Sequence, residues 1–128
     1  MNKLDLMRKR NDAMREIKYT NKAGSHRNCI RINVNNSLDH EIAKLRICYE
    51  LIRGGKEVFT EAVFVNGSRA DILVLDDFKI IEILCSESEE ACLEKSRKYP
   101  DLFELEMVKL KKYHTWNLMF ETETDDNK

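Results

Sequence analysis

The chain has 128 residues, of which 42% are hydrophobic and 35% charged, and its formal net charge is −1. This composition fits one soluble globular domain with a modest core, and no apolar run approaches the roughly 20 residues of a membrane span. Residues 1–14 include basic side chains but lack the apolar core of a secretion signal, so we expect a cytoplasmic protein. The four cysteines form no CxxC pair and fit free thiols in a reducing compartment better than a zinc site: Cys29, Cys48, Cys85 and Cys92.

Positive charge is concentrated at the N-terminus. Residues 1–31 carry nine lysines and arginines against three acids, whereas the rest of the chain carries 13 against 20. The patterns predict a weakly amphipathic basic helix over 3–18, a polar linker over 19–28 and a short alternating strand over 29–34. We treat residues 1–36 as a basic arm, which either contacts nucleic acid or is a solvated charged surface.

Residues 37–120 are expected to form the main domain, which opens with a strong helix. Ser37 offers an N-cap, acids follow in the first turn, and two glycines end the helix, which is predicted over 38–54. Its apolar stripe, and therefore its expected buried face, consists of Leu38, Ile42, Leu45, Tyr49 and Ile52.

Three strands should follow the helix. Residues 57–65 are β-branched and aromatic, and Asn66-Gly67 is a strong hairpin signal. Further strands are predicted over 69–75 and 79–84, joined across a tight turn at Asp76-Asp77.

The C-terminal part predicts another helix and another strand. Residues 86–100 begin with a serine cap and acids and end in basic residues before a proline, which favours a helix. Strands are predicted over 102–110 and 114–120, and residues 121–128 form an acidic tail. From residue 37 the expected order is α-β-β-β-α-β, an α/β fold with a mixed sheet flanked by helices.

Two acids stand where buried strands would prefer apolar residues. Asp71 lies in the run 70-ADILVL-75 and Glu82 in the run 80-IIEIL-84. A carboxylate in a half-buried strand is unfavourable unless something pairs with it. Because the tight turn brings the two strands together, the pair suggests a cation between them.

The order of elements and these residues together resemble the PD-(D/E)xK nuclease superfamily. Within that superfamily, the archaeal Holliday-junction-resolvase-like branch and small archaeal or viral relatives are the most similar in pattern. The resemblance covers about residues 37–110 and rests mainly on the run GSRADILVL, on the IIEIL strand and on the SESEE…K…YP pattern after it. It implies a restriction-endonuclease-like core.

The resemblance also implies roles for individual residues. Glu41 matches the glutamate of the first helix, Asp71 the aspartate of the second strand and Glu82 the acid of the third. Asp71, Glu82 and the backbone carbonyl of Ile83 would bind Mg²⁺ or Mn²⁺, with Glu41 assisting through a water. Such a cation neutralises a phosphate and lowers the pKa of an attacking water.

One position departs from the family pattern. The catalytic lysine should stand two residues after Glu82, where this chain has Leu84. Some members of the superfamily take the lysine from the following helix, and Lys95 is the best candidate here, with Lys98 second. If neither lysine reaches the acids, we expect a catalytically inactive nuclease fold that binds nucleic acid or protein.

The resemblance implies an Mg²⁺-dependent endonuclease acting on DNA, with branched DNA as one candidate substrate, and a homodimer. Residues expected to contact the DNA backbone are Arg8, Lys9, Arg10 and Arg69.

Structural alternatives stand beside each role. Asp71 could pair with Arg69, and Lys95 could be an ordinary cation at a helix C-terminus. His40 is interpreted as a surface histidine. Glu61 faces the site only if the hairpin loop before Arg69 has three residues, because a two-residue loop places it on the other face.

Overall fold

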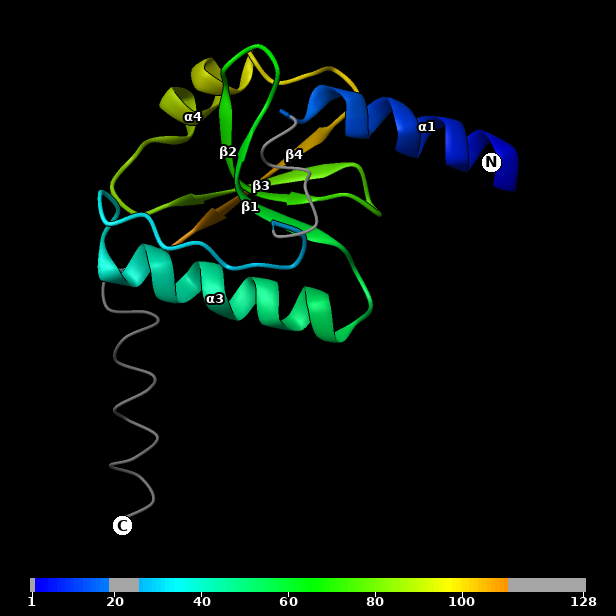
Figure 1. Cartoon of the computed structure of the whole chain (residues 1–128). Coiled ribbons are helices and arrows are strands. Elements are labelled where there is room, and N and C mark those ends of the chain that lie inside the picture. Colours follow the sequence, from blue (N-terminus) through cyan, green and yellow to red (C-terminus); the bar gives the residue numbers. More distant parts are fainter. Residues whose placement is uncertain (1, 19–25, 111–128) are drawn as a thin grey trace.

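A four-stranded mixed sheet with three helices forms the protein, seen in a computed structural model that describes residues 2–18 and 26–110 (Figure 1). The strands lie in the order β1-β2-β3-β4, with antiparallel pairing except between β3 and β4, which are parallel. The elements are α1 (Lys3–Glu16), α3 (Leu38–Arg53), β1 (Val58–Val63), β2 (Arg69–Val74), β3 (Lys79–Leu84), α4 (Glu89–Ser96) and β4 (Glu104–Lys109).

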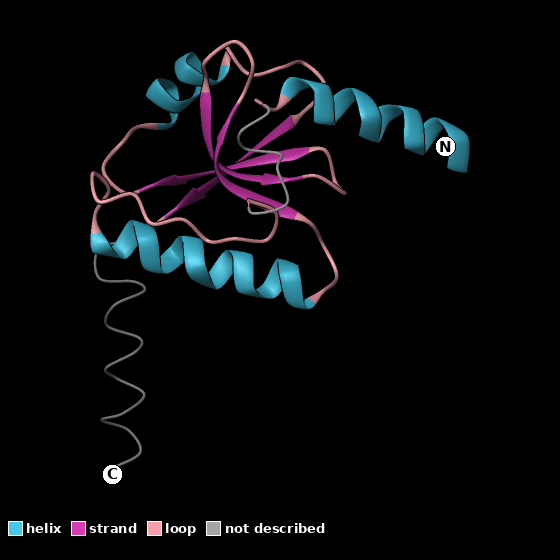
Figure 2. Ribbon diagram, in the orientation of Figure 1, coloured by secondary structure: helices cyan, strands magenta, loops and turns pink. Residues whose placement is uncertain are grey.

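The helices cover both faces of the sheet (Figures 1 and 2). α3 covers one face, where Ala43 and Cys48 pack against residues such as Ile72 and Ile81. α1 and the segment after α4 cover the other face, over a core that contains Ala13, Ile17, Phe59, Phe64, Leu73, Ile80 and Tyr99. The fold is therefore a three-layer α/β arrangement.

The expected α/β class and the order α-β-β-β-α-β from residue 37 onward are confirmed. Local capping explains why the helices begin where they do: Ser37 Oγ accepts the His40 N–H at 3.2 Å, and Ser88 Oγ accepts the Ala91 N–H at 3.1 Å. α4 is shorter than the helix predicted over 86–100, because its N-cap is Ser88 and it already ends at Ser96. The predicted strand over 114–120, the acidic tail and most of the linker lie outside the described residues.

The prediction of a strand over 29–34 is wrong. This segment is an extended loop held beside β1 by side chains rather than by a strand ladder. Thr60 Oγ1 accepts the Arg31 N–H at 2.8 Å and donates to the Cys29 carbonyl at 2.8 Å. The Thr60 side chain thus satisfies backbone groups that a neighbouring strand would otherwise pair with. The alternating residues of 29–34 therefore form no strand, and Ile32 is 75% exposed.

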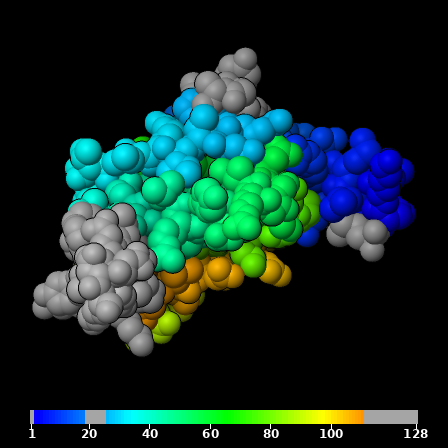
Figure 3. All heavy atoms as spheres, turned by 90° about the horizontal axis from the view of Figure 1, so that it is seen from below, coloured from blue at the N-terminus to red at the C-terminus, as the bar shows by residue number. Residues whose placement is uncertain are grey.

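The buried face predicted for the first long helix is also wrong. Three residues of the apolar stripe, Leu38, Leu45 and Tyr49, are at least half exposed. Figure 3 shows the molecule from the side on which α3 lies. The residues that α3 buries are instead His40, Ala43, Lys44 and Cys48. Polar side chains on the inner face find partners in the sheet, and these contacts fix the rotation of the helix.

No helix in the described part of the chain is both long and apolar enough to cross a membrane.

Candidate active site

An irregularity shared by β1 and β2 creates the site. In a regular strand, side chains alternate between the two faces of the sheet. Phe59 and Ala62 lie on the same face, as do Ala70 and Leu73, so both strands break this alternation between those residues. Glu61, at the break in β1, has a positive φ of 49° and lies opposite Asp71 in the register.

The hairpin loop determines which way Glu61 points. The Phe64 N–H donates to the Ser68 carbonyl at 2.8 Å, so the loop has three residues and ends at Gly67, whose φ is 90°. A three-residue loop was the condition under which we expected Glu61 to face the site. Its carboxylate does point to that side, where it accepts a hydrogen bond from Lys44.

β2 and β3 separate where the two acids meet. The backbone pairing of the two strands extends as far as Ile72 and Ile81. Beyond that pair, the carboxylates of the two acids accept hydrogen bonds from backbone N–H groups of the opposite strand. Glu82 Oε2 accepts the Asp71 N–H at 2.8 Å, and Asp71 Oδ2 accepts the Ile83 N–H at 2.8 Å. The strand separation therefore holds both carboxylates next to one another.

Two residues from the α4 region complete the surroundings of Glu82. Lys95 Nζ lies 3.0 Å from Glu82 Oε1, and the Tyr99 hydroxyl hydrogen-bonds to the same oxygen. The ammonium group of Lys95 therefore reaches Glu82 directly. Leu84, where the resemblance to the nuclease superfamily would place a lysine, is a buried core residue.

His40 links Glu41 to Asp71. Its Nδ1 lies 2.7 Å from Glu41 Oε2 and its Nε2 lies 3.2 Å from Asp71 Oδ2. His40 is 7% exposed, so the interpretation as a surface histidine is wrong. Glu41 reaches Asp71 through this imidazole ring.

A fully buried lysine lies behind these acids. Lys44 Nζ donates to Glu41 Oε1 at 2.8 Å, to Glu61 Oε2 at 3.1 Å and to the Arg31 carbonyl at 3.0 Å. The backbone N–H of Asn33 donates a hydrogen bond to Glu41 Oε1, and its side-chain amide donates one to Glu61 Oε1. Lys44 and Asn33 therefore tie α3, β1 and the 26–37 segment together at the edge of the site.

The two central carboxyl groups have opposite pKa shifts. Burial raises the pKa of Glu82, and the negative charge of Asp71 raises it further, so the pKa lies above its usual range. Burial acts in the same way on Asp71, but hydrogen bonds from His40 and the Ile83 N–H outweigh it and lower its pKa. Asp71 therefore binds a proton less strongly than Glu82 does.

Lys95 is held in its charged form. Burial disfavours the ammonium, but the Glu82 carboxylate outweighs this effect and raises the pKa of Lys95 above its usual range. Glu41 is held ionised in a similar way, because the Asn33 N–H and Lys44 outweigh the cost of burial and lower its pKa.

The site is open to solvent on two sides. One hollow, of about 300 Å³, is lined by His40, Asp71, Ile83 and Lys95 among others. A second hollow, of about 440 Å³, lies against Asp71, Lys95 and Arg69. A ligand can approach Asp71 from either hollow.

The available donor set suits a hard cation but is small. In the described part of the chain, no group of three or more His, Cys, Asp or Glu side chains is arranged to hold a metal ion. Asp71 Oδ1 accepts no hydrogen bond from the described residues, whereas Glu82 Oε1 is bound by Lys95 and Tyr99. Two carboxylates and one carbonyl are a set that fits Mg²⁺, which keeps several of its waters.

The cations of the N-terminal arm lie elsewhere. Arg10 pairs with Glu57 at 2.7 Å, and Lys9 lies 4.4 Å from the centre of the Phe78 ring, both near the turn between β2 and β3. Arg8 is exposed beside Asp5 on α1. Among the residues expected to contact DNA, Arg69 alone lies beside the two acids, and no ion pair joins it to Asp71 within the described residues.

Sequence reasoning missed three residues of the site: His40, Lys44 and Tyr99. Lys44 follows Glu41 by three positions, a spacing that joins side chains on one helix face, so that signal was available. Nothing in the local pattern indicates that Tyr99 reaches Glu82, because that contact depends on how α4 packs against the sheet.

Comparisons of this chain with protein-family models, with curated proteins and with solved structures give no match.

Proposed function

We propose that the protein is a metal-dependent nuclease that hydrolyses phosphodiester bonds in DNA. The observation that carries the proposal is the meeting of Asp71 and Glu82 where β2 and β3 separate, with Lys95 at 3.0 Å from Glu82. Perturbed carboxylates with a specific charged partner, beside an open hollow, are typical of functional sites. The order of elements and the positions of these acids also fit a PD-(D/E)xK nuclease with a restriction-endonuclease-like core.

Each residue has a distinct part in the proposal. Asp71, Glu82 and the Ile83 carbonyl would hold Mg²⁺ or Mn²⁺, which supplies charge neutralisation and a water of lowered pKa. The pKa of Asp71 is lowered, and its Oδ1 accepts no hydrogen bond from the described residues, so Asp71 suits direct binding of a cation. Lys95 would release Glu82 Oε1 and orient the attacking water in place of the missing strand lysine. His40 and Glu41 would position Asp71.

A second function is supported by a specific observation. In the described residues, Lys95 and Tyr99 already occupy Glu82 Oε1. If they do not release it, the same fold serves as a catalytically inactive module that binds nucleic acid or protein.

A cleavage assay separates the two functions. Linear and branched DNA are incubated with the protein in Mg²⁺, in Mn²⁺ and in EDTA, with Asp71→Ala as the test variant. Asp101→Ala is the matched control, because Asp101 is an exposed acid outside the hollows beside Asp71. The nuclease predicts cleavage that requires metal, survives Asp101→Ala and is lost in Asp71→Ala. Salt-dependent binding without cleavage indicates the inactive module.

A further inference from the structure

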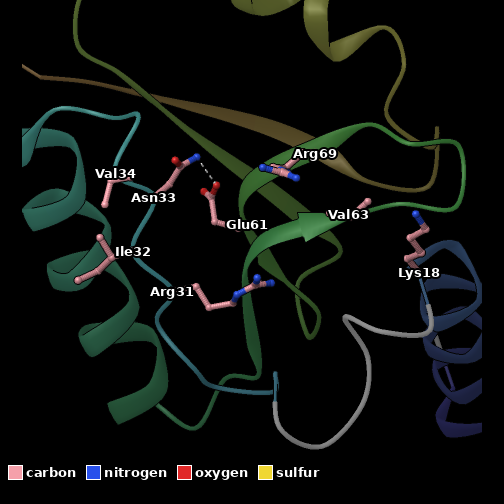
Figure 4. A pocket seen from close by; sticks show the side chains of 8 residues that line it. All are labelled: Lys18, Arg31, Ile32, Asn33, Val34, Glu61, Val63 and Arg69. Atoms are coloured by element: carbon pink, nitrogen blue, oxygen red, sulfur yellow. Dashed lines mark hydrogen bonds between the residues drawn. The ribbon is translucent and has the colours of Figure 1, made fainter.

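A third hollow, of about 460 Å³, borders the candidate site on the side of β1 (Figure 4). Lys18, Arg31 and Arg69 line it from three different parts of the chain. We propose that this hollow binds a backbone phosphate of the nucleic acid strand whose neighbouring phosphodiester lies at Asp71 and Glu82. The inference rests on the proposed function and extends it to a substrate-positioning site.

Within the described part of the chain, the three cations have no partner that neutralises them. Among the described residues, no carboxylate lies within ion-pair distance of Lys18, Arg31 or Arg69, and all three residues are exposed. The Arg31 guanidinium has only a 3.4 Å contact with His26 Nδ1. Three unpaired cations around one hollow form a site for an anion, and a phosphate accepts hydrogen bonds from both arginine and lysine.

The single acid of the hollow does not cancel this charge. Glu61 is 7% exposed, and its carboxylate accepts hydrogen bonds from the Asn33 side chain at 2.7 Å and from Lys44 at 3.1 Å. Figure 4 shows Asn33 and Glu61 joined in this way, with the arginine side chains around them. Because three cations face this one acid and Asn33 and Lys44 bind its carboxylate, the exposed cations remain available to a ligand.

The backbone at each cation is fixed. The Lys18 N–H donates to the Val63 carbonyl at 2.9 Å, and the Arg31 N–H donates to Thr60 Oγ1 at 2.8 Å. Arg69 is paired with Val63 across β1 and β2. A ligand therefore needs to order only the side chains, which reduces the entropic cost of binding.

The hollow continues into the candidate cation site. The hollow that contains Asp71 and Lys95 shares Asn33, Glu61 and Arg69 with this one. Arg69 precedes Asp71 by two residues, so their Cα atoms are about 6.6 Å apart in an extended strand. That separation is comparable to the step between neighbouring phosphates, so one strand can reach both places.

Binding of a fluorescein-labelled single-stranded DNA, measured by anisotropy against NaCl concentration in EDTA, tests this site. Each phosphate contact to a single strand contributes about 0.7 to the slope of log K against log salt. We expect Arg31→Gln and Arg69→Gln each to lower that slope by about this amount and to weaken binding to all sequences alike. Arg46→Gln is the matched control, because Arg46 is exposed on α3 and does not line the hollow.

The outcomes separate this inference from the proposed function. Wild-type slopes in both arginine variants, with unchanged melting temperatures, overturn the phosphate site and leave the nuclease proposal intact. A wild-type protein that neither binds nor cleaves DNA overturns both. Inorganic phosphate, which presents the same oxygens, should displace DNA from the wild type more strongly than chloride of equal ionic strength, and this advantage should fall in the two arginine variants. A phosphate effect that both substitutions leave unchanged would overturn the phosphate site.

Discussion

Replacing the buried Lys44 by methionine should destabilise the protein strongly. Lys44 has no exposed surface, and its ammonium group holds the carboxylates of Glu41 and Glu61 at 2.8 and 3.1 Å. Methionine keeps the apolar stem but leaves both acids without their cation. Removal of one partner from a buried ion pair costs about 3–5 kcal/mol. In a chain of this length, that loss lowers the melting temperature by roughly 10–20 °C.

Urea unfolding followed by circular dichroism measures the effect, with equal m-values required for the comparison. Lys56→Met is the matched control: Lys56 makes an equally short ion pair, 2.8 Å to Asp77, but its side chain is 39% exposed, so solvent screens the pair. Adding Glu61→Gln to Lys44→Met should restore part of the stability, because one uncompensated charge is removed. If Lys44→Met unfolds at the same urea concentration as Lys56→Met, the reasoning about the buried network is refuted.

Three further predictions concern the site and its hairpin. Lys95→Met should lower metal-dependent cleavage by about 10²-fold or more without unfolding the protein, whereas Lys98→Met should have little effect; single-turnover rates measure both. His40 has a raised pKa, because its carboxylate partners outweigh the effect of burial, which lowers it. The stability that it adds is complete below about pH 6.5 and is lost as pH rises through its folded-state pKa. In His40→Gln, the free energy of unfolding measured with urea should therefore change less with pH over that range than it does in the wild type. Gly67→Ala should cost about 1 kcal/mol in the same assay, because φ is 90° there although no atom obstructs a methyl group.

Much of the fold could be predicted because its signals are local. Ser37 caps α3 and Gly67 ends the first hairpin loop, and both features can be recognised from a few neighbouring residues. The strands of the sheet were predicted to within one or two residues of their ends, since their β-branched and aromatic runs are short and interrupted by turn residues.

The errors have a common physical origin in tertiary hydrogen bonds. Residues 29–34 alternate like a strand, but Thr60 holds their backbone in an irregular path. The apolar stripe of α3 indicated the wrong buried face, because Lys44 and His40 find compensating carboxylates on the inner side. Neither outcome can be derived from the residues of a single segment.

The site was predictable in part. Asp71 and Glu82 stood out because acids are unfavourable in apolar strands, and the structure places them in contact. That Lys95 reaches Glu82 was a hypothesis based on its position in a helix, and the 3.0 Å between the two side chains in the structure fits it. Tyr99 and the imidazole bridge between Glu41 and Asp71 required the packing of helices against the sheet.

The most direct test of the central claim is the single-turnover rate of Mn²⁺-dependent DNA cleavage by the wild-type protein and by Glu82→Gln. Glutamine keeps the shape of this buried side chain and removes its charge, so the fold should persist. The proposed nuclease predicts cleavage by the wild type and a fall to the level of buffer alone in the variant. Equal cleavage by both proteins, or none by the folded wild type, would contradict it.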